Sequence, residues 1–236
     1  MAGQRRASSH GSSVRPWQHD GMTWHRIARA QLALALTDAG PDAPTLCEGW
    51  QSRQLAAHVV LREHSPLAGA GIVVPALAAR TERAIEQLAD TARSEDGYRD
   101  LVARVASEPA GWSPMSWAGE QVNLVEYFVH TEDVRRGGGP VPPLALEPEH
   151  AEALWRSLVL RASMFYRRVP AGIVLVRTDG VRRRVRRAPS GHGTVVIRGA
   201  VGELLLHAFG RGAASDVEIE GARADVEALR AVLPTV

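Results

Sequence analysis

A glutamate and a histidine lie four residues apart in the apolar segment 124–130, LVEYFVH. Residues at positions i and i+4 of an α-helix share one face and lie about 6 Å apart along its axis. Apolar residues flank the pair, so we expect Glu126 and His130 to point into the protein. A buried carboxylate needs compensation for its lost hydration, and a divalent cation with imidazole as co-ligand supplies it.

This spacing leaves two interpretations open, a pair of metal ligands or a half-buried pair joined by a hydrogen bond. A third residue favours the metal. His58 is the one strongly polar residue of the segment 55–61, LAAHVVL. The alternative for His58 is a core histidine with a satisfied hydrogen bond. Helices that each place an inward donor in a bundle core are a common way to build a metal site, and His58, Glu126 and His130 fit that pattern.

Composition bounds the class of protein. The chain has 236 residues, 45% of them hydrophobic and 23% charged, as in soluble globular proteins. All 28 basic residues are arginine, and a net charge of +2 is too small to indicate nucleic-acid binding. The single cysteine excludes an intramolecular disulfide. Neither a spanning apolar run nor a signal peptide is visible, so we predict a cytoplasmic protein with no membrane or nucleic-acid partner.

Residues 1–21 contain hardly any aliphatic side chains, so they are predicted to be a disordered tail, with Met22 as the effective start. Helical spacing and capping signals then predict a helical domain over residues 22–168. The expected helices cover about 23–38, 52–63, a segment from about 75, the region around 98–105, the segment containing 124–130, and about 148–168.

The pattern changes after Pro170, where apolar β-branched runs replace the helical spacing. A small α+β domain is predicted over residues 169–236. Its expected strands cover 173–176, 181–187, 195–197 and 217–219, with Asp179-Gly180 as a hairpin turn. The expected helices cover about 200–209 and 222–233.

Three segments together resemble a known family: TLCEGW at 45–50, LAAH at 55–58 and EYFVHTEDVR at 126–135. They are similar to the mycothiol-dependent maleylpyruvate isomerase metal-binding family of the DinB-like superfamily, closest to an actinobacterial subgroup of DinB-like metal-binding proteins. GELLL at 202–206 and the Gly210-Arg211 pair extend the resemblance into the second domain. The resemblance implies a DinB-like four-helix bundle followed by a small C-terminal α+β domain.

The resemblance also implies a site. By position, His58, Glu126 and His130 would hold a divalent metal, usually zinc in that family. Three protein ligands leave one coordination position open, and zinc lowers the pKa of a bound thiol. The implied activity is a thiol-dependent transferase or isomerase, with mycothiol or a similar thiol as cosubstrate and Arg211 holding an anionic, electrophilic substrate. The competing hypothesis is a non-catalytic metal-binding sensor or structural module, and the chain would be a monomer or homodimer.

Other residues depart from the family or stay ambiguous. Gln51 and Gln54 stand where the family has Thr and Asp, so we expect weak capping of the second helix. Asp133 is either a partner of a ligand histidine or a solvated residue. Glu132 is expected to be exposed, and Cys47 is expected to be inert rather than a metal ligand. The arginines of 182–187 predict an exposed hairpin rather than a site for an anion.

Overall fold

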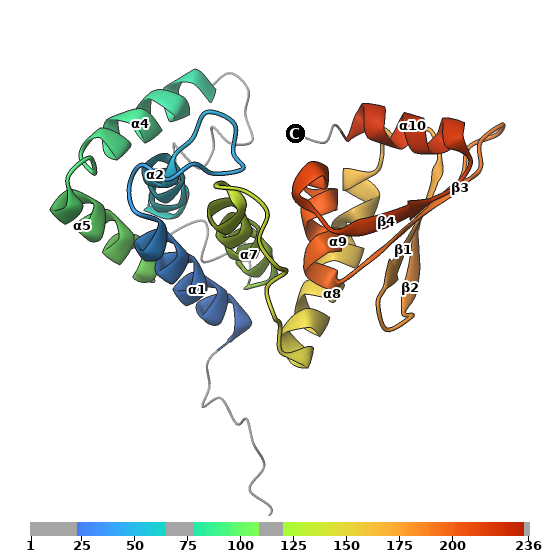
Figure 1. The fold of residues 1–236 in the computed structure, drawn as a ribbon, viewed down its shortest axis with the longest axis horizontal. Helices are drawn as coiled ribbons and strands as arrows, with labels where there is room; N and C mark the ends of the chain where they lie inside the picture. The colour runs from blue at the N-terminus through green and yellow to red at the C-terminus, as the bar shows by residue number, and fades with distance from the viewer. Residues whose placement is uncertain (1–22, 65–77, 109–119, 234–236) are drawn as a thin grey trace, which may run out of the picture.

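A computed structural model describes residues 23–64, 78–108 and 120–233. The tail predicted for residues 1–21 and the helix start predicted near Pro75 lie outside these ranges. Within them, the N-terminal part of the chain is helical and the C-terminal part combines a sheet with helices (Figure 1). The predicted fold class, a helical bundle followed by a small α+β domain, is confirmed.

The N-terminal part consists of helices, of which α7 carries Glu126 and His130. In chain order they are α1 (Trp24–Ala39), α2 (Ser52–His64), α4 (Ala78–Asp90), α5 (Glu95–Ala106), α7 (Glu120–Arg136) and α8 (Pro148–Phe165). α1 lies along α7, while α4 and α5 cover α2 on its other side (Figure 1). α8 packs against α7 on one side and against the C-terminal elements on the other. It ends at Phe165 rather than at the predicted Arg168, because the chain turns at Tyr166, which is fully buried.

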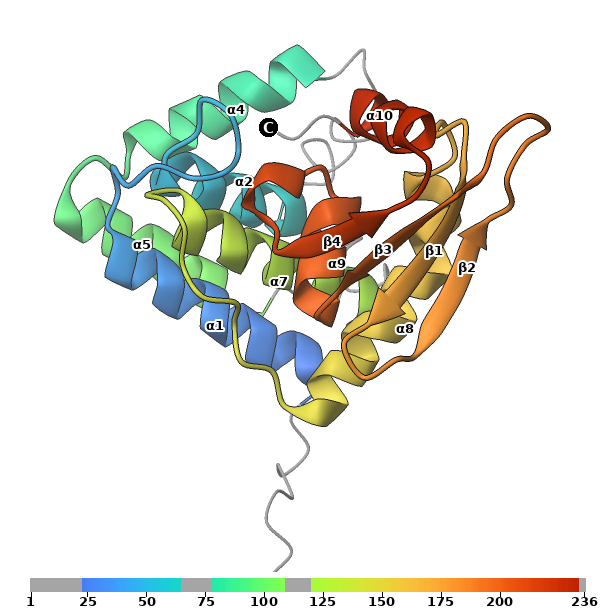
Figure 2. The same cartoon turned by 45° about the vertical axis from the view of Figure 1, so that its right-hand side comes forward.

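The C-terminal part is built on a four-stranded sheet with the order β2-β1-β3-β4. Its elements are β1 (Gly172–Arg177), β2 (Arg182–Arg186), β3 (Thr194–Gly199), α9 (Val201–Ala208), η2 (Gly212–Ala214), β4 (Val217–Glu220) and α10 (Arg223–Val232). β1 pairs with β3 in parallel, and both outer pairings are antiparallel. α9 contacts β1, β3 and β4 on one side and α7 on the other (Figure 2). α9 therefore joins the sheet to the helix that carries the candidate ligands.

One buried cluster of apolar side chains runs from the bundle into the sheet. At the junction, a Cβ built on Gly202 of α9 would lie 2.7 Å from Cζ of Phe128 on α7. Only a glycine lets the two helices approach so closely. No helix among the described residues is long and apolar enough to cross a membrane.

The start of α2 has half of a capping box. Oε1 of Gln54 accepts a hydrogen bond of 3.1 Å from the backbone N–H of Gln51, which is the reverse half of a capping box. The backbone N–H groups of Ser52 and Arg53 donate to the carbonyls of Ala43 and Pro41. Gln54 and the preceding loop therefore satisfy the first amides of the helix, whereas the side chain of Gln51 donates to the carbonyl of Asp42 and does not cap.

Candidate metal centre

The structure brings His58, Glu126 and His130 together. Glu126 and His130 lie one turn apart on α7, with Glu126 Oε2 3.5 Å from His130 Nε2. His58 comes from α2, and its ring centroid lies 5.3 Å from that of His130. One ligand atom from each residue lies within 4.8 Å of the others. Helical spacing placed the first two residues on one face, and the packing of α2 against α7 adds the third.

The protonation of His58 and Glu126 suits metal ligands. Burial, followed by the charges of His130 and Arg62, lowers the pKa of His58 to about 3, so its imidazole is neutral. Burial raises the pKa of Glu126, but the hydrogen bond from His130 and the charge of Arg62 outweigh it and bring it to about 2. Two imidazoles and a carboxylate form a donor set that zinc accepts.

Asp133 holds the Nδ1 side of the His130 ring. Its Nδ1 lies 3.0 Å from Asp133 Oδ2, one turn further along α7. Burial lowers the pKa of His130, but hydrogen bonds to Asp133, Cys47 and Glu126 outweigh it and raise the pKa well above its ordinary value. A metal that binds Nε2 of His130 would have to displace a proton whose binding these hydrogen bonds favour. Of the two interpretations of Asp133, the structure supports the partner of a ligand histidine.

Arg211 reaches this group from the C-terminal domain. Its Nε and Nη2 donate to the two oxygens of Asp133 at 2.9 and 2.8 Å. Its Nη1 donates to the carbonyl of Phe209 at 2.7 Å. The prediction that Arg211 holds an anionic substrate stays a prediction, since all three of its nitrogens have protein partners in this structure.

Arg62 is the neighbour that the sequence reasoning missed. It follows His58 by four residues on α2, and its Nη1 donates to Glu126 Oε2 at 2.7 Å. The shared helix face was the available signal. We expected a metal alone to compensate the charge of Glu126, but the guanidinium of Arg62 also compensates it.

The prediction that Glu132 is exposed was wrong. Glu132 is fully buried and forms ion pairs with Arg135 and Arg136. Arg136 also pairs with Glu203 of α9 at 2.7 Å. The end of α7 lies between the bundle and the C-terminal domain, so side chains on both of its faces are covered (Figure 1).

Cys47 lies beside the candidate centre rather than apart from it. Its Sγ is 3.3 Å from Asp133 Oδ2 and 3.5 Å from Arg211 Nη2. One potential ligand atom from each of Cys47, His130 and Asp133 also lies within 4.8 Å of the others. A metal at that second cluster would compete with the guanidinium of Arg211 for Asp133, so the His58–Glu126–His130 cluster is the better supported site.

A cavity of about 610 Å³ opens onto His58 and His130. Trp50 lies against His58 with ring centroids 5.2 Å apart, and its Nε1 donates to Glu82 at 3.1 Å. Gly49 precedes Trp50 with φ of +75°, a conformation that favours glycine, and so lets the loop turn toward the cavity. The lining comes from both the N-terminal and the C-terminal parts of the chain and consists of Leu46, Cys47, Glu48, Trp50, His58, Glu82, His130, Phe209, Gly210 and Arg211.

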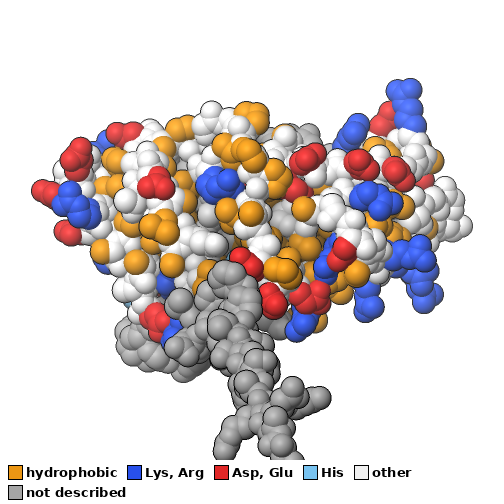
Figure 3. All heavy atoms as spheres, turned by 60° about the horizontal axis from the view of Figure 1, so that its bottom comes forward, with side chains coloured by type: hydrophobic (Ala, Val, Ile, Leu, Met, Phe, Trp, Pro, Cys, Tyr) orange, Lys and Arg blue, Asp and Glu red, His pale blue; other side chains and the backbone are white. Residues whose placement is uncertain are grey.

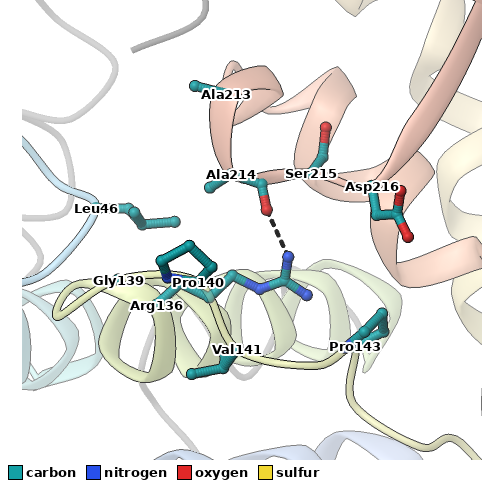
Figure 4. Close-up of a pocket in the computed structure, with 10 residues that line it drawn as sticks. All are labelled: Leu46, Arg136, Gly139, Pro140, Val141, Pro143, Ala213, Ala214, Ser215 and Asp216. Carbon is teal, nitrogen blue, oxygen red and sulfur yellow. Dashed lines mark hydrogen bonds between the residues drawn. The ribbon is translucent and has the colours of Figure 1, made fainter.

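A neighbouring cavity of about 450 Å³ shares Leu46 with the first (Figure 4). Its walls include Pro140, Val141 and Ala213, with Arg136 as the basic residue. The guanidinium of Arg136 is engaged by Glu132, Glu203 and the carbonyl of Ala214. The one basic side chain that lines this cavity is therefore committed to the protein.

The arginine-rich strand β2 is exposed, as predicted. Arg182, Arg183 and Arg184 face solvent, and Arg186 is partly covered. Figure 3 shows basic side chains crowded at the end of the molecule that carries the sheet. This surface is remote from the cavity lining and contributes no residue to it.

Comparisons with known proteins agree with the fold. No protein-family model and no curated protein matches this chain. Among solved structures, the mycothiol-dependent maleylpyruvate isomerase matches with a TM-score of 0.53 and 20% identity, over 84% of this chain and 90% of that chain. A mutant of that enzyme with one histidine replaced by alanine matches with a TM-score of 0.57, with the same identity and coverage. The chain thus has the fold of the mycothiol-dependent maleylpyruvate isomerase.

Proposed function

We propose that the protein binds one divalent metal, most simply zinc, through His58, Glu126 and His130. We further propose that it activates a low-molecular-weight thiol such as mycothiol for a transferase or isomerase reaction on an electrophilic substrate. The observation that carries the proposal is the convergence of two imidazoles and a carboxylate, with both imidazoles at the wall of a 610 Å³ cavity. When bound, the metal would lower the pKa of the thiol, so that a thiolate is present near neutral pH.

The protein's own residues would prepare this site. Burial keeps His58 neutral, and Asp133 holds the Nδ1 side of the His130 ring, which leaves Nε2 on the side of Glu126. The Nδ1 contact selects the ring orientation that a ligand needs. Trp50 and Phe209 line the cavity and shield part of it from water. A thiol with its electrophile would therefore meet in a partly enclosed space between the two domains.

Metal analysis of purified protein tests the first part. We expect near-stoichiometric metal in the wild type and its loss in His58→Ala and His130→Ala. His64→Ala is the matched control, since His64 lies on the same helix but is exposed. Metal that survives both ligand substitutions at wild-type stoichiometry would contradict the proposal. Native mass spectrometry of protein purified from its own cytoplasm would report metal, retained thiol and subunit number together.

The second candidate function is a metal-binding sensor or structural module without turnover. The observation that favours it is the engagement of Arg211 by Asp133 and Phe209, which leaves its guanidinium committed within the protein. An assay of mycothiol with maleylpyruvate and other electrophilic acceptors separates the two functions. Turnover that depends on both thiol and metal supports the enzyme, whereas thiol binding without turnover of any acceptor supports the module.

A further inference from the structure

A buried arginine contacts the candidate ligand Glu126. The side chain of Arg62 is 4% exposed, and its Nη1 donates to Glu126 Oε2 at 2.7 Å. Its Nη2 donates to Oδ1 of Asn123, one turn before Glu126 on α7, at 2.8 Å. The guanidinium therefore bridges two consecutive turns of the helix that carries the candidate ligands.

The surroundings hold Arg62 in this position. Its guanidinium lies 5.9 Å from the ring centroid of Tyr127, whose other neighbour is Arg29 at 4.6 Å. Tyr127 is fully buried, and its hydroxyl donates to Glu63 at 2.5 Å. Arg29 also pairs with Glu63 at 2.7 Å. Because these groups are buried and mutually bonded, Arg62 has no solvated position to which it can withdraw at little cost.

The same carboxylate oxygen faces both Arg62 and His130. Glu126 Oε2 lies 2.7 Å from Arg62 Nη1 and 3.5 Å from His130 Nε2. A metal bound among His58, Glu126 and His130 would draw on this carboxylate and would lie close to a fixed positive charge. Like charges repel more strongly in a partly buried site than in bulk water, so the guanidinium opposes the metal even while it holds the carboxylate.

We propose that Arg62 is an internal counter-ion that compensates Glu126 when no metal is bound, and that it sets the metal affinity below what the three ligands alone would give. This inference rests on the proposed metal site. Its consequence is a site whose metal-free state is stable and whose metal is exchangeable, rather than one that unfolds without metal. In this proposal Arg62 acts through its charge on Glu126 and is not itself a ligand.

The test compares wild type, Arg62→Met and Arg53→Met by competition with a chelator and by thermal melting, with zinc alone as the probe. Methionine keeps an unbranched side chain and removes the charge. Arg53 is the matched control, because it is a buried arginine on the same helix that pairs with Asp42.

We expect Arg62→Met to bind zinc about tenfold or more tightly than the wild type, the size of one charged hydrogen-bond interaction. Without metal, its melting temperature should fall by a few °C, because Glu126 loses its buried counter-ion and keeps only His130 as a partner. Zinc should then raise the melting temperature of Arg62→Met by more than it raises that of the wild type. Arg53→Met should leave zinc affinity unchanged.

Equal or weaker zinc binding by Arg62→Met would overturn the proposal, since a role in positioning alone predicts weaker binding. If Arg62→Met does not fold without metal, the Arg62→Met/Glu126→Gln variant should recover stability, because no unpaired charge remains. Failure of that recovery would also contradict the proposal. A wild type that binds no zinc beside an Arg62→Met that does would refute the proposed function and leave this inference standing.

Discussion

Asp133 and Arg211 form a two-fold hydrogen-bonded ion pair across the junction between the helical bundle and the C-terminal domain. Their distances are 2.9 Å from Nε to Oδ1 and 2.8 Å from Nη2 to Oδ2, and the side chain of Asp133 is 0% exposed. The same carboxylate lies 3.0 Å from Nδ1 of His130. The C-terminal domain therefore reaches the candidate ligand His130 through one buried carboxylate.

This relationship predicts that Arg211 supports metal binding without being a ligand. Arg211→Met should weaken zinc affinity by about 10- to 100-fold, the usual cost of losing a group that orients a ligand. The zinc affinity of Arg211→Lys should lie between those of the wild type and Arg211→Met, because lysine keeps the positive charge but cannot donate to both oxygens of Asp133 as arginine does. Chelator competition measures the affinities. Arg223→Met, which removes an exposed arginine of α10, is the control and should match the wild type. Wild-type affinity in Arg211→Met would show that Asp133 holds His130 unaided.

The second prediction concerns the buried cluster of Arg136 with Glu132 and Glu203. Arg136 pairs with them at 2.6 and 2.7 Å, and all three residues are buried. Arg136→Met removes the arginine that pairs with Glu203 and leaves Glu132 with Arg135 alone, so the free energy of unfolding should fall by about 3 kcal/mol. Urea denaturation measures this change. Arg156→Met removes an exposed helical pair with Glu152 and should cost less than about 0.5 kcal/mol.

The third prediction concerns the contact between α7 and α9. Gly202→Ala places a methyl group 2.7 Å from Cζ of Phe128. The clash should lower the free energy of unfolding by about 1–3 kcal/mol. Phe128→Leu combined with Gly202→Ala should recover part of the loss, because the smaller side chain makes room. Gly138→Ala is the control, since a Cβ there meets nothing within 4 Å. Equal effects of Gly202→Ala and Gly138→Ala would rule out close packing at this junction.

The fourth prediction concerns pH and the buried His207. Burial lowers the pKa of His207 to about 4, while in the unfolded chain it titrates near 6.5. As pH falls below 6.5 the unfolded chain takes up a proton that the folded protein refuses. This contribution to stability is therefore complete above pH 6.5 and is lost as pH falls toward 4, by up to about 3 kcal/mol.

Urea denaturation of His207→Leu between pH 7 and 4.5 checks this sign. The variant starts less stable, because the hydroxyl of Tyr166 loses its 3.0 Å partner. It should nevertheless lose less stability than the wild type on acidification. His64→Ala should follow the wild-type profile, since His64 is exposed. Parallel profiles for His207→Leu and the wild type would contradict the shifted pKa.

The sequence by itself determined the local elements and the candidate ligand set. Helix and strand positions follow from the spacing of apolar residues, and the predicted bounds differ from the observed ones by a few residues at the ends. Glu126 and His130 share a face because of helical geometry alone. His58 stood out because it is polar within an apolar helix. These features are local, so a pattern along the chain is sufficient to find them.

Only the tertiary structure decided which charges meet. Arg62 contacts Glu126 across 64 positions and Arg211 contacts Asp133 across 78 positions. The parallel pairing of β1 with β3 and the burial of Glu132 likewise depend on how distant elements pack. From the sequence alone, a charged residue is predicted to be exposed to solvent. Its burial becomes favourable only when another element supplies a partner of opposite charge. The counter-ions of the candidate centre are therefore properties of the packed protein.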